Sequence, residues 1–165
     1  MLEDPPIVLP YAGAEDEGVV ESVPEHDPAA GDAVDFLRHE HSKLEAVLEE
    51  ILAQLDAQGL DAARMRWGGV VRETLEHAVA EERVVWAALP PDAVAGVRDQ
   101  QAKLLAELRD QDALNPDVDA SRMRATVELV REHARQVADV VLPGLAQLPA
   151  ARRMALGDDL RQVMG

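Results

Sequence analysis

A chain of 165 residues with 47% hydrophobic residues has room for one domain with a sizeable core and an appended segment. Its formal charge of −16, without a basic stripe, argues against a nucleic-acid or anionic-membrane partner. The chain has no cysteine, which excludes disulfides, thiolate catalysis, zinc knuckles and iron–sulfur clusters. Any bound metal must therefore use histidine and carboxylate ligands.

The chain begins without the basic start and apolar run of a signal peptide, and no stretch approaches the roughly 18 apolar residues of a membrane helix. We therefore expect a cytoplasmic protein. Only 2% of the residues are aromatic, and Ala, Leu and Val dominate the apolar set. This composition favours an all-α fold.

Residues 1–31 differ in character from the rest of the chain. They hold five of the ten prolines and eight Asp or Glu residues, without a single Lys or Arg. Such a segment has little to bury, so we predict a disordered acidic tail. It would serve as a solubilising extension, or alternatively as an arm for a protein partner that the sequence does not identify.

Apolar residues recur every three or four positions from Asp32 onward, the spacing of amphipathic helices. We predict a first helix that Asp32 or Gly31 caps and that ends at Gly59. A second helix should run from about Asp61 to Leu89, where Pro90 and Pro91 stop it. Asp92 should cap a third helix, which ends near Asp112. A fourth begins near Asp119 or Ser121 and runs to Leu148, with Pro143 expected to kink or break it. Short loops make this an up-and-down four-helix bundle over residues 32–149, followed by a short helix over 150–165.

Polar residues interrupt the apolar stripe near the middle of every predicted helix. His41 lies on the first helix, His77 and Glu81 on the second, Gln101 on the third and His133 on the fourth. Burying an unpaired carboxylate or amide costs several kcal/mol, so these groups need partners at that level. In an antiparallel bundle the middles of the helices lie at similar heights, so these side chains can converge.

Three imidazoles and a carboxylate suit iron, zinc or manganese. His77 and Glu81 are four residues apart, which places both on one helical face. Each histidine taken alone is more often a hydrogen-bonded core residue, whereas the joint pattern favours a metal site at His41, His77, Glu81 and His133. His26 lies in the tail, and His39 points about 200° away from His41, so neither belongs to the set.

From Ala33 to Leu148 the chain resembles the hemerythrin, or HHE cation-binding, family. The resemblance rests on Phe36-Leu37-Arg38-His39-Glu40-His41-Ser42-Lys43-Leu44, His77-Ala78-Val79-Ala80-Glu81-Glu82, Gln101-Ala102-Lys103-Leu104-Leu105, and His133 with Val141-Leu142-Pro143. It implies a metal-binding bundle that holds two irons. Of the family's ligand positions, His41, His77, Glu81 and His133 match.

Two positions depart from the family pattern. Gln101 stands where a helix-three histidine is expected, and Val137 and Ala138 stand where a second bridging carboxylate should be. A di-iron centre needs bridging anions, and one carboxylate is a poor supply for the reversible oxygen binding that the resemblance implies. The alternatives are a mononuclear site, a dinuclear site completed by substitutes such as Gln101, Glu45 or Glu73, and a site that has decayed. Asp139 points about 240° from His133 and is a poor substitute.

Two functional hypotheses follow from this set. The first is a non-enzymatic metal protein that stores iron or senses oxygen, nitric oxide or redox state; the second is a metal-free scaffold. An enzyme is the third class, but the Glu-x-x-His pairs of di-iron carboxylate oxidases and the His-Glu-x-x-His motif of metalloproteases are both lacking.

Overall fold

The computed structural model describes residues 31–114 and 117–165, and within these ranges every regular element is helical. The predicted acidic tail lies outside the described residues except for Gly31, as does the Asn115-Pro116 part of the predicted turn. No helix in the described ranges has the length and apolar character needed to cross a bilayer.

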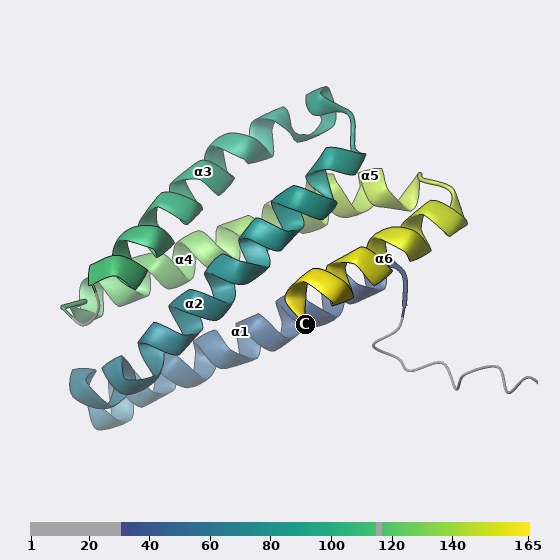
Figure 1. The fold of residues 1–165 in the computed structure, drawn as a ribbon. Helices are drawn as coiled ribbons and strands as arrows, with labels where there is room; N and C mark the ends of the chain where they lie inside the picture. The colour runs from purple at the N-terminus through teal and green to yellow at the C-terminus, as the bar shows by residue number, and fades with distance from the viewer. Residues whose placement is uncertain (1–30, 115–116) are drawn as a thin grey trace, which may run out of the picture.

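Four long helices form the bundle (Figure 1): α1 (Ala33–Gln58), α2 (Leu60–Val84), α3 (Pro91–Leu114) and α4 (Ala120–Gln136). Each packs against the next along the chain, and α1 also contacts α4, which closes the bundle. Beyond α4 the chain continues through a π-helical turn, η3 (Val137–Val141), into α5 (Leu142–Ala146), and then forms α6 (Ala150–Met164). The predicted all-α bundle with a C-terminal helix is thereby confirmed.

Local sequence signals explain most helix ends. The Asp32 carboxylate accepts hydrogen bonds from the N–H groups of Val34 and Asp35 and caps α1, while Asp119 accepts from the N–H of Arg122 and caps α4. Gly59 has a φ of 90°, a backbone conformation that favours glycine, and it separates α1 from α2. The cap predicted at Asp32 or Gly31 is thus Asp32, the fourth long helix starts near Asp119 as predicted, and the predicted stop at Gly59 is present.

Three predicted details were wrong. Asp92 does not cap α3: the helix begins one residue earlier, at Pro91, whose ring suits a first helical position, and Asp92 lies inside the first turn. The α-helical part of α2 ends at Val84, and a short 3-10 helix, η2 (Trp86–Ala88), fills the space up to the two prolines. The irregularity expected at Pro143 lies in the preceding turn, η3, where the Leu142 N–H donates to the Val137 carbonyl.

The apolar core is divided into two clusters along the bundle axis. One cluster gathers the start of α1, the segment around η2, the start of α3, η3, α5 and α6. The other gathers the second half of α1, the first half of α2 and the facing parts of α3 and α4. On each of the four long helices, the inward polar residues lie in sequence between the residues of one cluster and those of the other. They are His41, His77, Glu81, Gln101 and His133. The polar residues thus form a layer at the middle of the bundle, as the sequence predicts.

Helix α6 packs along the outside of α1 and α2 (Figure 1). Arg153 donates to the Asp32 carboxylate at 2.8 Å, and Arg161 donates to the Gly31 carbonyl at 2.8 Å. Gly157 allows the close approach, because a Cβ there would lie 2.9 Å from the Gly31 carbonyl oxygen. The C-terminal helix is therefore fastened to the residues that begin the bundle.

Candidate metal centre

Three helices bring four side chains to one point in the polar layer. His41 comes from α1, His77 and Glu81 from α2, and His133 from α4. Each offers one ligand atom, and the four atoms lie within 4.8 Å of one another. Among the described residues this is the group of His, Asp and Glu side chains that could hold a metal ion.

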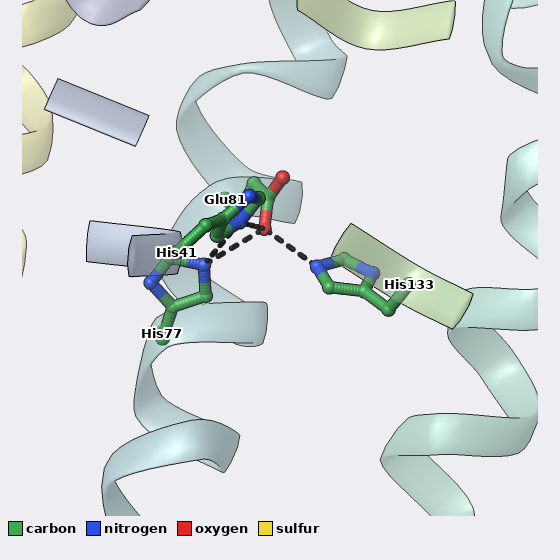
Figure 2. Close-up of side chains that lie close together, drawn as sticks. All are labelled: His41, His77, Glu81 and His133. Atoms are coloured by element: carbon green, nitrogen blue, oxygen red, sulfur yellow. Dashed lines mark hydrogen bonds and ion pairs between the residues drawn. The ribbon is translucent and has the colours of Figure 1, made fainter. Parts of the chain in front are cut away.

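One carboxylate oxygen lies at the centre of the group (Figure 2). Glu81 Oε2 is 3.0 Å from His133 Nε2, 3.2 Å from His77 Nε2 and 3.9 Å from His41 Nε2. Figure 2 shows His133 reaching the carboxylate from the side opposite to His77. All three imidazoles therefore direct the same ring nitrogen toward one oxygen.

The distances of 3.0, 3.2 and 3.9 Å lie on either side of the spacing of ligands around a small ion. Zinc-like ions bind nitrogen and oxygen ligands at about 2.0–2.2 Å in tetrahedral geometry, which separates neighbouring ligand atoms by about 3.3–3.6 Å. The Nε2 atoms of His41 and His77 are 3.0 Å apart, and two imidazole nitrogens can share only one proton. A cation between the nitrogens would satisfy both lone pairs, so the donor set fits a metal ion.

Burial makes the arrangement electrostatically demanding. The Glu81 side chain is fully buried, and those of His77 and His133 are 6% and 2% exposed. Burial acts to raise the pKa of Glu81, but the positive charge of His133 and hydrogen bonds from His133, His41 and His77 outweigh it and hold the pKa well below the ordinary 4.5. The carboxylate is therefore ionised at neutral pH and needs cationic neighbours.

Several buried atoms around the centre have no partner among the described protein groups. They are Glu81 Oε1, Gln101 Oε1 and His133 Nδ1. The two oxygens are able to accept hydrogen bonds from water or to act as ligands of a cation. A metal-bound histidine usually donates its second N–H to an acceptor, and His133 lacks a protein acceptor for it. The four candidate ligand atoms thus have close polar neighbours, whereas the atoms around them lack protein hydrogen-bond partners.

The auxiliary residues predicted from the sequence lie elsewhere or are otherwise engaged. Gln101 is buried in the polar layer, but its amide nitrogen donates to the Ala78 carbonyl at 2.9 Å. The carboxylate of Glu45 forms an ion pair with Arg131 at 2.7 Å, and Glu73 is exposed on α2. Neither carboxylate joins the four-residue group in this structure.

The positions after His133 also lack a carboxylate that faces the centre. Val137 is fully buried, whereas Ala138 and Asp139 are exposed. The outward position of Asp139 agrees with its predicted angle. Arg131, which engages Glu45, is a residue that the sequence analysis did not single out: the two are 86 residues apart, and helical spacing within one helix cannot reveal a pairing between α1 and α4.

One comparison with known proteins identifies the family of this chain. The model of the family described as "Hemerythrin HHE cation binding domain" matches residues 32–145, well over half of the chain, and this range includes all four candidate ligands. Searches of the curated proteins and of the solved structures gave no significant match. The family match implies a metal-binding site, and the chain belongs to the hemerythrin HHE cation-binding family.

Proposed function

We propose that this protein binds one transition-metal ion through His41, His77, Glu81 and His133, with iron as the expected metal and zinc and manganese as the alternatives. The observation that carries the proposal is the convergence of three imidazole nitrogens and one carboxylate oxygen within 4.8 Å. Nitrogen and carboxylate donors in this ratio suit these ions, while calcium and magnesium prefer oxygen donors alone.

One ion is favoured over two because the part of the chain that the structure describes supplies one carboxylate to the group. Two adjacent cations repel each other unless anions bridge them, and Glu81 is the carboxylate of the group. Val137 takes up a buried position one turn after His133, and the Gln101 amide is bonded to the α2 backbone. A mononuclear centre is therefore the assignment that best fits these residues.

The role we propose is non-enzymatic: storage of the ion, or sensing of oxygen, nitric oxide or redox state by it. An iron held by four protein ligands would supply redox chemistry and an affinity for diatomic ligands. The residues supply its position and charge: the ionised Glu81 balances one positive charge in a buried layer. We place the protein in the cytoplasm, a reducing compartment with which a chain without cysteine is compatible.

A metal-free scaffold is the second candidate, and one observation favours it. The four side chains already contact one another, with His133 against Glu81 and His41 against His77, both at 3.0 Å. Suitably protonated, they would form a buried network without an ion, and such networks can help to specify a fold. This candidate and the metal site predict different effects of neutralising Glu81.

Metal content per chain, measured by plasma mass spectrometry, tests the proposal. The protein would be produced with iron and zinc present and desalted without chelator. We expect about one metal per chain, and almost none in Glu81→Gln, because the amide loses the charge and a ligand oxygen. Glu82→Gln is the matched control, since Glu82 is the exposed neighbour on the same helix. No metal in the unaltered protein, even after anaerobic iron addition, would favour the scaffold.

A further inference from the structure

A pocket of about 680 Å³ lies between α1 and α2 on the side of the bundle covered by the end of α6. Its walls are mostly apolar, formed by Leu44, Val47, Leu75, Val79, Val163 and Met164. The size is within the range of small-molecule pockets, about 300–1,000 Å³. The family match ends at residue 145, so the α6 wall is an addition outside the matched domain.

The pocket reaches the candidate metal centre through His77. This histidine lines the pocket, and its Nε2 is one of the four ligand atoms. The side chains of His41 on α1 and His77 on α2 are 11% and 6% exposed, whereas those of His133 and Glu81 are 2% and 0%; of the four, His77 lines the pocket. The centre is therefore less covered on the side of α1 and α2, the helices that form the pocket, than on the side of α4.

Charged residues at the pocket favour cations. Glu40, Glu73 and Glu76 contribute three carboxylates, against the single ammonium of Lys43. Lys43 forms an ion pair with Glu40 at 3.1 Å, which offsets one of the three. Glu73 and Glu76 are exposed on α2, one turn or less from His77. A negative mouth on an apolar pocket raises the local concentration of cations and lowers that of anions.

We propose that this pocket is the route by which divalent cations reach the metal centre, with Glu73 and Glu76 attracting them and Val163 and Met164 of α6 narrowing the passage. The inference rests on the proposed metal-binding function. It adds a selection step to that function, because small cations pass the acidic mouth more readily than anions, while the ligands determine which cation is retained.

The test is the rate of Co²⁺ binding to metal-free protein, followed in a stopped-flow spectrometer by the visible absorption of the ion in a low-symmetry nitrogen and oxygen site. Glu73→Gln/Glu76→Gln should slow binding by about three- to tenfold at low ionic strength and weaken its dependence on salt. The final absorbance per chain should be unchanged, because neither residue is a ligand. Glu49→Gln/Asp99→Asn, which neutralises two exposed carboxylates away from the pocket, should leave the rate unchanged.

A steric variant tests the route independently of charge. Val79→Trp adds bulk to a half-buried wall position and should slow Co²⁺ binding with the same final absorbance. Val140→Trp, at an exposed position outside the pocket, is its control. Met164→Ala widens the passage and should speed binding.

The outcomes separate the route from the function. If the unaltered protein reaches no Co²⁺ absorption at equilibrium, the metal-binding proposal fails. If it binds Co²⁺ but the charge and steric variants bind as fast as their controls, the ion enters elsewhere and the route is wrong.

Discussion

His133 on α4 and Glu81 on α2 meet across the centre of the bundle, with Nε2 and Oε2 3.0 Å apart and both side chains almost fully buried. This pair connects α4 with α2, whereas His41 and His77 connect the adjacent helices α1 and α2. A carboxylate buried to this extent is stable only beside a cation or strong hydrogen-bond donors. The pair therefore links the stability of the fold to the proposed metal binding.

Replacing His133 with alanine should weaken the protein even without metal. Removing one partner of a buried charged pair typically costs about 3–5 kcal/mol, because the remaining charge is left uncompensated. We expect His133→Ala to lower the free energy of unfolding in chelator by an amount of this order, measured by urea denaturation. His39→Ala, on the exposed face of α1, is the control and should change stability little. Equal stability of the two variants would contradict the assignment of Glu81 as an ionised core residue.

Metal removal should lower the melting temperature of the unaltered protein and leave that of Glu81→Gln unchanged. A ligand that binds only the folded state stabilises it by about 2.7 kcal/mol when its free concentration is 100 times the dissociation constant. Differential scanning calorimetry with and without chelator measures the effect. A chelator-induced shift of equal size in both proteins would show that the ion binds outside the four-residue group.

Gly157 should tolerate no side chain without movement of α6. A Cβ there would lie 2.9–3.1 Å from backbone atoms of Gly31, Asp32 and Ala33, which cannot rotate away. We expect Gly157→Ala to destabilise the protein by about 1–3 kcal/mol, as for other overpacked positions. Gly69→Ala, in an open part of α2, should instead stabilise by about 0.5–1 kcal/mol. Urea unfolding of both variants checks the contrast, which a stabilised Gly157→Ala would overturn.

The Asp32–Arg153 pair should contribute stability that acid removes. Burial acts to raise the pKa of Asp32, but hydrogen bonds from Arg153 and the N–H groups of Asp35 and Val34, with the Arg153 charge, hold it below the ordinary 3.8. A carboxyl whose pKa is lower in the folded state stabilises fully above the unfolded value and loses this contribution as pH falls through the folded value.

Asp32→Asn isolates that charge, because asparagine can still cap α1. We expect the variant to be less stable by about 0.5–1 kcal/mol at pH 7, the order of a partly exposed ion pair. The difference should shrink as the pH falls below about 3.8. Urea titrations from pH 7 to pH 3 measure it, and a difference that stays constant over this range would exclude the proposed role of the charge.

Gln111 should contribute to the stability of the folded protein without affecting the proposed metal centre. Its side-chain oxygen accepts the indole N–H of Trp67 at 2.7 Å, and its nitrogen donates to Thr126 Oγ1 and Glu107 Oε1. Gln111→Ala leaves buried donors and acceptors without partners, which costs about 1–3 kcal/mol. We expect reduced stability and altered Trp67 fluorescence with unchanged metal content. A loss of metal would mean that the two polar regions are coupled.

Helical periodicity and end signals made much of the fold predictable. Apolar spacing placed the four helices, and Asp32, Gly59 and Asp119 marked three ends because capping depends on short-range geometry. The convergence of the polar layer also followed, since antiparallel helices of similar length align their middles. Each of these inferences uses distances along one helix or the symmetry of a bundle.

Pairings between distant segments could not be predicted in the same way. The angle of Glu45 around α1 brings it near the inner face, but its partner Arg131 lies on another helix. The attachment of α6 depends on contacts of Arg153 and Gly157 with residues about 120 positions earlier. Gln111 is polar and buried, yet only its contacts with Trp67 and Thr126 explain why it is tolerated.

The π-turn at Val137–Val141 changes the direction in which side chains point between His133, a proposed ligand, and Pro143. One extra residue in a turn rotates everything after it by about 100° relative to a continuous α-helix. That rotation lets Val137, Val141, Leu142 and Leu145 all face the core. Residues beyond Val141 must therefore be matched to other proteins in space rather than by counting. A single-residue deletion within the turn would keep the ligand in place while turning Leu142 and Leu145 toward water.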